Sequence, residues 1–266
     1  MNRHLVGTAE GALHFRSAGD LAAADPAVLF FHQSPSSSRM WAGVMAALEE
    51  RGVASLAGDM FDYGMSDRQT TQLGVDDHVR LLLEAAGQLT DARLIAVGHH
   101  TGAVFAATAA IHEAVRALML IGYPLYSSWR EKYERLGGRI GPDRFSDDGS
   151  ELAELWARLN TSIEPDTPFI ARYDVLVDRL SAGPLWFTAY AALMQTDLEA
   201  ALANAVATGK PSRAVFAQDD AISRVEPGVT AVVGSEPVWI EGGPWVTVEH
   251  PGRVADVVAG FVEENA

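Results

Sequence analysis

The sequence predicts an α/β fold with a mostly parallel central sheet flanked by helices. Short apolar runs bounded by turn residues alternate with segments in which apolar residues recur at helical spacing. This alternation indicates βαβ units, which place their strands in a parallel sheet. Between residues 123 and 196 the alternation stops and only helical pieces occur, so we expect a helical cap inserted into the α/β unit.

The expected strands are short apolar runs, most of them flanked by turn residues. The first two, at 5–8 and 12–16, lie on either side of the turn signal Glu10-Gly11. The third, AVLFF at 27–31, is continuous and apolar, as is typical of a buried strand. The remaining expected strands are 54–57, 93–97, 117–121, 214–217 and 238–241.

The expected helices carry apolar residues on one face. The helix over 39–51 groups Met40, Val44 and Leu48 and stops at Gly52. The helix over 103–114 is rich in small apolar residues, which suits close packing on a sheet. The other core helices are expected over 76–89, 197–207 and 253–263, and the helical pieces of the cap over 129–136, 150–159, 171–180 and 186–194.

This pattern divides the chain into two expected parts. The α/β core comprises residues 1–122 and 197–266, and the cap comprises residues 123–196. The cap contains aromatic side chains that are available to line a cavity, namely Tyr126, Trp129, Trp156, Trp186 and Phe187. As a group they indicate an apolar or aromatic small-molecule ligand.

Composition excludes several classes of function. The 266 residues carry a formal net charge of −15, which argues against nucleic acid as a partner, because a backbone binder needs clustered Lys and Arg. The chain has no Cys, which excludes disulfides, thiolate metal sites and Cys nucleophiles. It shows neither a signal-peptide pattern nor an apolar run long enough for a membrane span. We therefore expect a cytoplasmic protein, monomer or homodimer, with no membrane partner.

The pentapeptide GHHTG, residues 98–102, directly follows an apolar run. A segment of this glycine-x-residue-x-glycine form at the end of a buried strand exposes its middle residue, usually a Ser nucleophile, on a sharp strand-to-helix turn. The middle residue here is His100. An imidazole therefore stands where a hydroxyl nucleophile is expected.

Five segments in the same order resemble those of the α/β-hydrolase superfamily, and the resemblance covers essentially the whole chain. GHHTG resembles the nucleophile elbow, FFHQSP the oxyanion-loop motif HGxP, and GDMFDYGMSD the segment DxxGxGxSD, with Asp62 in place of a glycine. FAQDDAIS resembles the GxxDxI segment that carries the catalytic acid, and GGPWVTVEHPGRVADVVAGFV the terminal segment that normally begins GGH. The resemblance implies the α/β-hydrolase fold, although a fold does not by itself establish chemistry.

The triad that this resemblance implies is altered at two positions. The nucleophile position is His100, and the position of the catalytic His is Pro244. His250 comes six positions later, where the family also commonly has His before Pro, so it is a poor replacement. The ordinary Ser-His-Asp mechanism requires a hydroxyl nucleophile and a separate imidazole. Neither group is at its expected place.

We interpret the two changes as related. His100 can extend its ring toward the space of the usual His, which Pro244 leaves vacant, and hydrogen-bond Asp220 at the acid position. Asp220 would orient the ring and raise its basicity, as the acid of a triad does. The neighbouring Asp219 is the alternative acid, but the family offset favours Asp220. The expected result is an acid/base dyad without a nucleophile.

The resemblance also implies an oxyanion hole made by the backbone N–H groups of Ser34 and Thr101, which survive changes of side chain. The helix that starts at Thr101 directs its positive end toward a developing anion. Gln33 adds a side-chain amide near the site. The other residues expected to bind substrate are His32, Tyr123, Trp129, Trp186 and Trp245.

Several of these residues have a structural alternative. His100 can simply fill a pocket in a protein that has lost activity. His99 and His32 sit at positions where a structural role is more common, and Asp59 and Asp62 are expected to shape their loop, with Asp62 as a further candidate to face the pocket. Two adjacent His residues on a tight turn are poor chelators, and no metal or nucleotide motif is present, so neither cofactor nor metal is expected.

The sequence thus supports two hypotheses. The first is an enzyme that acts on a small apolar or aromatic carbonyl compound, of ester, lactone or ketone type, by non-covalent acid/base catalysis. Its reaction would be that of a lyase, a decarboxylase, a cyclase or isomerase, or a hydrolase that activates water. The second is a catalytically silent protein of the same fold that binds a small molecule. Ordinary serine hydrolysis is the least favoured option.

Overall fold

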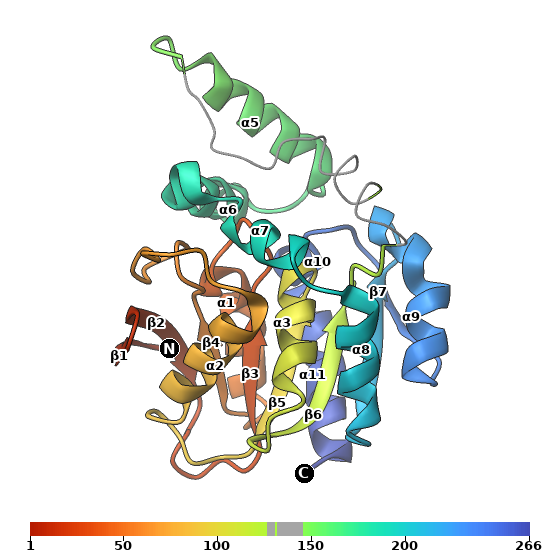
Figure 1. Cartoon of the computed structure of the whole chain (residues 1–266). Coiled ribbons are helices and arrows are strands. Elements are labelled where there is room, and N and C mark those ends of the chain that lie inside the picture. Colours follow the sequence, from red (N-terminus) through yellow and green to blue (C-terminus); the bar gives the residue numbers. More distant parts are fainter. Residues whose placement is uncertain (127–130, 132–145) are drawn as a thin grey trace.

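The structure, a computed structural model, describes residues 1–126, 131 and 146–266 (Figure 1). Its centre is an eight-stranded sheet in the order β1-β2-β4-β3-β5-β6-β7-β8. The strands are β1 Asn2–Thr8, β2 Gly11–Ala18, β3 Ala27–Phe31, β4 Ser55–Gly58, β5 Leu94–His99, β6 Val115–Ile121, β7 Ser212–Ala217 and β8 Val238–Ile240. Strand β2 is antiparallel to both β1 and β4, and all other neighbouring pairs are parallel. The predicted, mostly parallel sheet is confirmed.

From β3 on, helices separate most of the strands in the chain, and α10 and α11 follow β8. The helices in the described residues are η1 Ser38–Trp41, α1 Ala42–Glu49, α2 Val75–Ala86, α3 Thr101–Ala109, α5 Ser150–Ser162, α6 Phe169–Ala182, η2 Gly183–Leu185, α7 Thr188–Met194, α8 Leu198–Ala207, η3 Ala221–Val225, α9 Glu226–Val233, α10 Val246–Glu249 and α11 Pro251–Glu264. No helix of the described segments is long and apolar enough to cross a membrane.

Helices cover both faces of the sheet. Helices α2, α3 and α8 lie on one face, in front of the strands in Figure 1, and α1 and α11 lie on the other. Strand β3 shows why the strands are apolar throughout: Leu29 and Phe31 pack in the core with α2 and α3, whereas Val28 and Phe30 pack in the core with α1 and α11. A strand buried on both faces has no polar side to alternate with.

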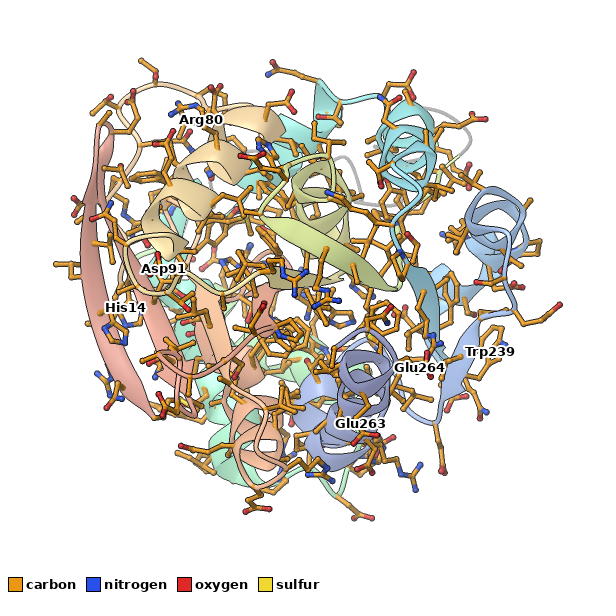
Figure 2. The ribbon with its side chains drawn as sticks, turned by 90° about the horizontal axis from the view of Figure 1, so that it is seen from below. His14, Arg80, Asp91, Trp239, Glu263 and Glu264 are labelled. Atoms are coloured by element: carbon orange, nitrogen blue, oxygen red, sulfur yellow. The ribbon has the colours of Figure 1, made fainter. Side chains whose placement is uncertain are left out.

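The two edges of the sheet differ. In the view from below in Figure 2, His14 on β2 lies toward one edge and Trp239 on β8 marks the opposite edge. The edge strand β1 is largely exposed, and its hairpin partner β2 continues the sheet to β4. Ala9 and Glu10 form the turn between them, one residue earlier than the turn signal Glu10-Gly11 predicts, and Gly11, the first residue of β2, has a φ of +135°.

Helices α5, α6 and α7 lie above the sheet in Figure 1, between β6 and α8 in the chain. They correspond to the helical pieces expected over 150–159, 171–180 and 186–194, while the piece expected over 129–136 falls outside the described residues except at position 131. Contacts from the α7 region reach the segment after β3, at the carboxyl ends of the strands. The division into a core and a cap at residues 123 and 196 stays a prediction.

Candidate active site

The GHHTG segment forms a sharp turn between β5 and α3. His100 has a φ of +49° and a ψ of −114°, and α3 begins at the next residue. The two glycines are needed for close backbone contacts: a Cβ on Gly98 would lie 2.1 Å from the carbonyl oxygen of Gly102, and a Cβ on Gly102 would lie 2.2 Å from that of Phe31. This tight packing of helix and strand holds His100 at the carboxyl edge of the sheet.

His100 and Asp220 are hydrogen-bonded. Nε2 of His100 lies 2.6 Å from Oδ2 of Asp220, which follows β7 and precedes η3. The other carboxylate oxygen of Asp220 accepts a hydrogen bond from the Ile222 N–H at 3.0 Å. Burial opposes ionisation of Asp220, but the charge and the hydrogen bond of His100 outweigh burial and lower the pKa of the carboxyl group. Asp220 is therefore ionised and accepts a hydrogen bond from the His100 ring.

The neighbouring acid is placed differently. Asp219 is exposed, and its N–H donates to the Gly242 carbonyl at 2.9 Å. Its carboxylate has no recorded hydrogen bond or ion pair with a described residue. Of the two candidate acids, the structure brings Asp220 to His100.

His250 lies in another network. Its Nε2 is 2.9 Å from Oε1 of Glu164, between α5 and α6. The preceding residue, Glu249, accepts hydrogen bonds from the N–H groups of Glu164 and Gly243. These contacts connect the terminal segment to the α5–α6 link, which agrees with a structural role for His250.

His99 lies beside His100 but faces the core. The centres of the two rings are 4.1 Å apart, and neither ring nitrogen of His99 has a hydrogen-bond partner among the described residues. Burial, reinforced by the charge of His100, holds the pKa of His99 well below its usual value, so this ring is neutral.

The same region contains a set of potential metal ligands. His99, His100 and Asp220 offer ligand atoms that all lie within 4.8 Å of one another. The adjacent rings are thus closer to a chelating arrangement than the sequence suggests, and nitrogen and carboxylate ligands are the types that Zn²⁺ takes. In this structure His100 and Asp220 are joined directly by the hydrogen bond of 2.6 Å, and the two residues are called the dyad below.

The loop after β3 contributes three of the expected site residues. His32 is fully buried and uses both ring nitrogens within the fold: Nδ1 lies 2.9 Å from the Gln33 carbonyl oxygen, and Nε2 accepts from the Met60 N–H at 3.0 Å. Burial lowers the pKa of His32, consistent with a neutral ring that donates from Nδ1. Gln33 is buried, and its N–H contacts the sulfur of Met40 at 3.4 Å. His32 therefore shapes the loop.

Ser34 is tied to the elbow and to α7. Its N–H donates to Oγ1 of Thr101 at 2.6 Å, and its carbonyl accepts from the Tyr190 hydroxyl at 2.5 Å. Its own hydroxyl donates to the Tyr63 hydroxyl at 2.8 Å, and Tyr63 also donates to the Trp186 carbonyl. The two residues expected to form the oxyanion hole are thus in direct contact.

A cavity of about 340 Å³ opens over the dyad. Its lining consists of His100, Thr101, Pro124, Tyr126, Tyr190, Leu193, Asp220, Ala221, Ile222 and Arg224. The sequence singled out Tyr126 as a cavity aromatic, but it gave no indication of Tyr190, Leu193 or Arg224. Helical spacing identifies the helix that carries Tyr190 without saying which of its faces meets the elbow.

The other aromatic residues expected to bind substrate lie elsewhere. Tyr123 is buried in the core, and its hydroxyl donates to the Leu198 carbonyl at 2.6 Å. The guanidinium of Arg179 covers the Trp186 ring at 3.7 Å from its centre. Trp245 lines a separate apolar cavity of about 320 Å³ beside α5 and α6. Trp129 is outside the described residues.

The loop after β4 carries the two acids that the sequence expects to shape it, Asp59 and Asp62. Asp59 is buried and accepts from the Ser38 N–H and the Met65 N–H, and its Oδ2 lies 2.8 Å from Nδ1 of His14. Asp62, at a φ of +75°, accepts hydrogen bonds from the backbone and side chain of Gln69. Both carboxylates hold loop geometry, and neither is among the residues that line the dyad cavity.

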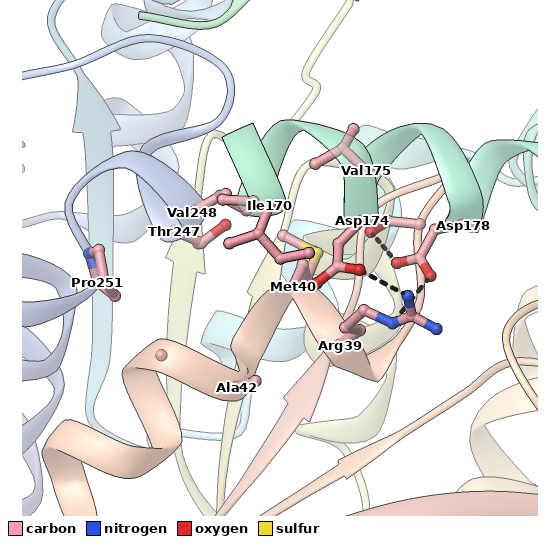
Figure 3. A pocket seen from close by; sticks show the side chains of 13 residues that line it. Arg39, Met40, Ala42, Ile170, Asp174, Val175, Asp178, Thr247, Val248 and Pro251 are labelled. Carbon is pink, nitrogen blue, oxygen red and sulfur yellow. Dashed lines mark hydrogen bonds and ion pairs between the residues drawn. The ribbon is translucent and has the colours of Figure 1, made fainter. Parts of the chain in front are cut away.

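Helix α6 packs against η1, which follows the loop after β3 (Figure 3). Arg39 of η1 reaches two acids of α6: its Nη1 lies 3.0 Å from Asp174, and its Nε lies 3.5 Å from Asp178. The buried Asp178 also accepts from the Ser37 hydroxyl at 2.8 Å. A cavity of about 210 Å³ adjoins this contact.

Comparison with known proteins agrees with this architecture. Residues 26–222 match the family described as alpha/beta hydrolase fold. The chain belongs to this family. A comparison with curated protein sequences gives no significant match.

Solved structures of this α/β-hydrolase fold align over nearly the whole chain. Bromoperoxidase from Bacillus anthracis is 17% identical, with 98% of this chain and 100% of that chain covered and a TM-score of 0.80. E-2-(acetamidomethylene)succinate hydrolase is 22% identical, with coverages of 98% and 99% and a TM-score of 0.75. The enol-lactonase from Burkholderia xenovorans is 14% identical, with coverages of 98% and 100% and a TM-score of 0.77. At these identities the likeness is one of fold.

Proposed function

We propose that this α/β hydrolase is an enzyme that uses His100 as a general acid/base on a small apolar or aromatic carbonyl compound. The observation that carries the proposal is the 2.6 Å contact between His100 Nε2 and Asp220 Oδ2 under a cavity. A positioned imidazole oriented by a carboxylate is the working part of a triad. Because the nucleophile position holds His100 and no hydroxyl, that pair acts on substrate or water directly.

The hydrogen bond to Asp220 fixes which nitrogen is the base. The carboxylate accepts from Nε2–H, so the neutral ring carries its lone pair on Nδ1. No described residue hydrogen-bonds to Nδ1. In the ordinary triad the acid binds Nδ1, and Nε2 handles the proton. The two nitrogens of His100 exchange these roles because the ring approaches Asp220 from the elbow.

The reaction follows from these positions. Nδ1 of His100 removes a proton from a carbon next to the carbonyl, or from a water molecule that attacks it. The negative charge that develops on the carbonyl oxygen lies near the N-terminus of α3, whose N–H groups and dipole favour it. The proton then returns from Nδ1 to the product. Isomerisation, elimination and water-mediated hydrolysis fit this sequence of steps. Decarboxylation of a β-keto acid would start instead with a protonated His100: the C–C bond to the carboxylate breaks, CO2 leaves with its electron pair left on the enolate, and Nδ1 gives its proton to the enolate carbon.

The solved structures of the same fold support a small-molecule substrate. Their names include an enol-lactonase, an aryl esterase and E-2-(acetamidomethylene)succinate hydrolase. The cavity volume and its mixed aromatic and apolar wall agree with a compound of that size. We also propose that residues 123–196 form a cap, of which the described residues Pro124, Tyr126 and Tyr190 line the cavity over the dyad.

The test is turnover of a panel of 4-nitrophenyl esters, enol lactones and β-keto acids, compared across matched variants. His100→Ala should lower kcat/KM by on the order of 10² to 10⁴, the usual contribution of a general base. Asp220→Asn should lower it by on the order of 10² or more, because the amide no longer fixes the tautomer. Asp219→Asn and His250→Gln are the controls and should keep wild-type turnover.

Each outcome separates the candidate functions. Full turnover by His100→Ala would contradict the proposal that His100 is the general acid/base. Binding of panel compounds without conversion by the wild-type protein would favour the silent binding protein instead. A covalent adduct with a serine-reactive organophosphonate at the elbow would point to serine hydrolysis, and we expect none, because residue 100 is not Ser.

A further inference from the structure

The side chain of Thr101 accepts the hydrogen bond of the Ser34 N–H, one of the two donors expected in the oxyanion hole. The Ser34 N–H points at Oγ1 of Thr101 at 2.6 Å, well within hydrogen-bond distance. Thr101 is buried, yet it lines the same cavity as His100. A substrate oxygen can therefore reach the Ser34 amide only by displacing this hydroxyl.

A hydroxyl that accepts one hydrogen bond still has a proton to donate. Thr residues inside a helix usually donate it to the carbonyl three or four residues earlier. Thr101 is the first residue of α3, where the preceding residues belong to the elbow and to β5, so this acceptor is missing. Within the described segments, the only recorded hydrogen bond of Oγ1 is the one it accepts from Ser34.

The backbone N–H of Thr101 is a second donor without an acceptor among the described residues. The first N–H groups of a helix have no acceptor within the helix, and none is recorded for Thr101 among the described residues. Thr101 therefore has two donors, the hydroxyl and the amide, beside His100 and at the wall of one cavity.

We propose that Thr101 is itself the oxyanion site, with its side-chain hydroxyl in the place of the Ser34 amide. The Ser34 N–H donates to Oγ1 and so polarises the hydroxyl toward a substrate oxygen. Tyr190 holds Ser34 in this position through the hydrogen bond to its carbonyl. The inference rests on the proposed function, because it assigns the group that stabilises the oxygen on which His100 develops charge.

Three variants at one position separate the roles of Thr101. Thr101→Val keeps the shape and removes the hydroxyl, Thr101→Ser keeps the hydroxyl, and Thr101→Ala removes the group and exposes the Ser34 amide. The loss of a single oxyanion donor costs on the order of 10²-fold in kcat. We expect that loss for Thr101→Val, near wild-type turnover for Thr101→Ser, and partial recovery for Thr101→Ala over Thr101→Val. Wild-type kcat for Thr101→Val would overturn the assignment.

A binding measurement keeps this test independent of catalysis. Benzoate presents an anionic oxygen on an aromatic body, and its Kd can be measured by calorimetry for the wild-type protein and the variants, with thermal melts to confirm folding. Weaker binding to Thr101→Val than to Thr101→Ser supports the inference even if His100→Ala proves active. Equal binding to the two variants, or no binding to the wild-type protein, contradicts it. Failure of the proposed function shows instead as unchanged turnover of His100→Ala.

Discussion

His100 stores conformational strain at the elbow. A side chain with a Cβ rarely adopts a φ of +49° with a ψ of −114°, and such residues cost on the order of 1–3 kcal/mol. Strain of this kind persists where the surrounding packing leaves no alternative, and here Gly98 and Gly102 provide that packing. Stability and the presentation of the ring therefore oppose each other at this residue.

This strain can be measured with two variants. His100→Ala and His100→Gly both delete the ring and its bond to Asp220, but only Gly adopts the elbow conformation freely. We expect the Gly variant to exceed the Ala variant in free energy of unfolding by about 1 kcal/mol, measured by urea denaturation. An Ala variant as stable as the Gly variant would show that the elbow is not strained.

His78 is a second buried imidazole with a distinct effect on stability. It lies between the rings of Phe61 and Phe105, and neither of its nitrogens has a hydrogen-bond partner among the described residues. Burial lowers its pKa to about 4. The unfolded chain therefore binds this proton more readily than the folded one, so stability is lost as the pH falls from the unfolded pKa of 6.5 through 4.

Replacement by Phe should remove this acid sensitivity. From the shift in pKa, the His78→Phe variant should gain about 3 kcal/mol on the wild-type protein between neutral pH and a pH below 4. Any change in packing appears as a constant offset, so the pH dependence of the difference isolates the titration. If the difference in free energy of unfolding between His78→Phe and the wild-type protein did not change with pH, the predicted titration of His78 would be wrong.

The sequence predicts some of the contacts in the candidate site and not others. His100 and Asp220 follow from the positions of the elbow and the acid in ordered motifs, and the structure brings them together. The contact between Ser34 and Thr101 joins residues 67 positions apart and depends on the rotamer of one threonine. No local pattern reports that arrangement, so the hydroxyl was absent from the expected oxyanion hole.

Among the elements, the core strands and helices were predicted best, because their apolar periodicity is strong. The helix expected over 39–51 begins instead as the 3-10 turn η1, with Ser37 as its N-cap, and continues as α1. Helix α9 was not predicted: EPGVTAVV carries Pro and Gly in its first turn and Val in the rest. Pro is tolerated at the start of a helix, but Val-rich segments resemble strands.

The contact of α6 with η1 contains a buried carboxylate whose charge is costly. Burial raises the pKa of Asp178 to about 6, although Arg39 and Ser37 partly offset it. The folded state binds this proton more tightly than the unfolded state. Stability therefore falls as the pH rises from 3.8 through 6, and the loss is complete above that range.

Asp178→Asn should gain stability relative to the wild-type protein over the same range of pH. A shift of this size corresponds to about 3 kcal/mol, and the gain should be largest above pH 6 because Asn carries no charge. Asp174→Asn, which removes the other carboxylate beside Arg39, controls for the weakened ion pair. Thermal melts between acid and neutral pH provide the measurement, and an unchanging difference for Asp178→Asn would refute the expectation.

At the scale of the molecule, the order of the five motifs predicted the fold, and the strand order and the family match agree with it. The helical pieces between residues 146 and 196 were also expected, but their contacts were not. Each of these helices presents several faces of similar composition, so the sequence does not predict which aromatic side chains lie beside the elbow. Tyr190 lines the dyad cavity, whereas Trp186 and Trp245 do not.

The cavity over the dyad is built from four separate stretches of chain. His100 and Asp220 come from loops after β5 and β7, while Pro124, Tyr126 and Tyr190 come from the two ends of the segment between β6 and α8. Substitutions in that segment can therefore alter which molecules fit without altering the proton-transferring pair. Over evolutionary time, selectivity and reaction type can diverge at independent rates in proteins built this way.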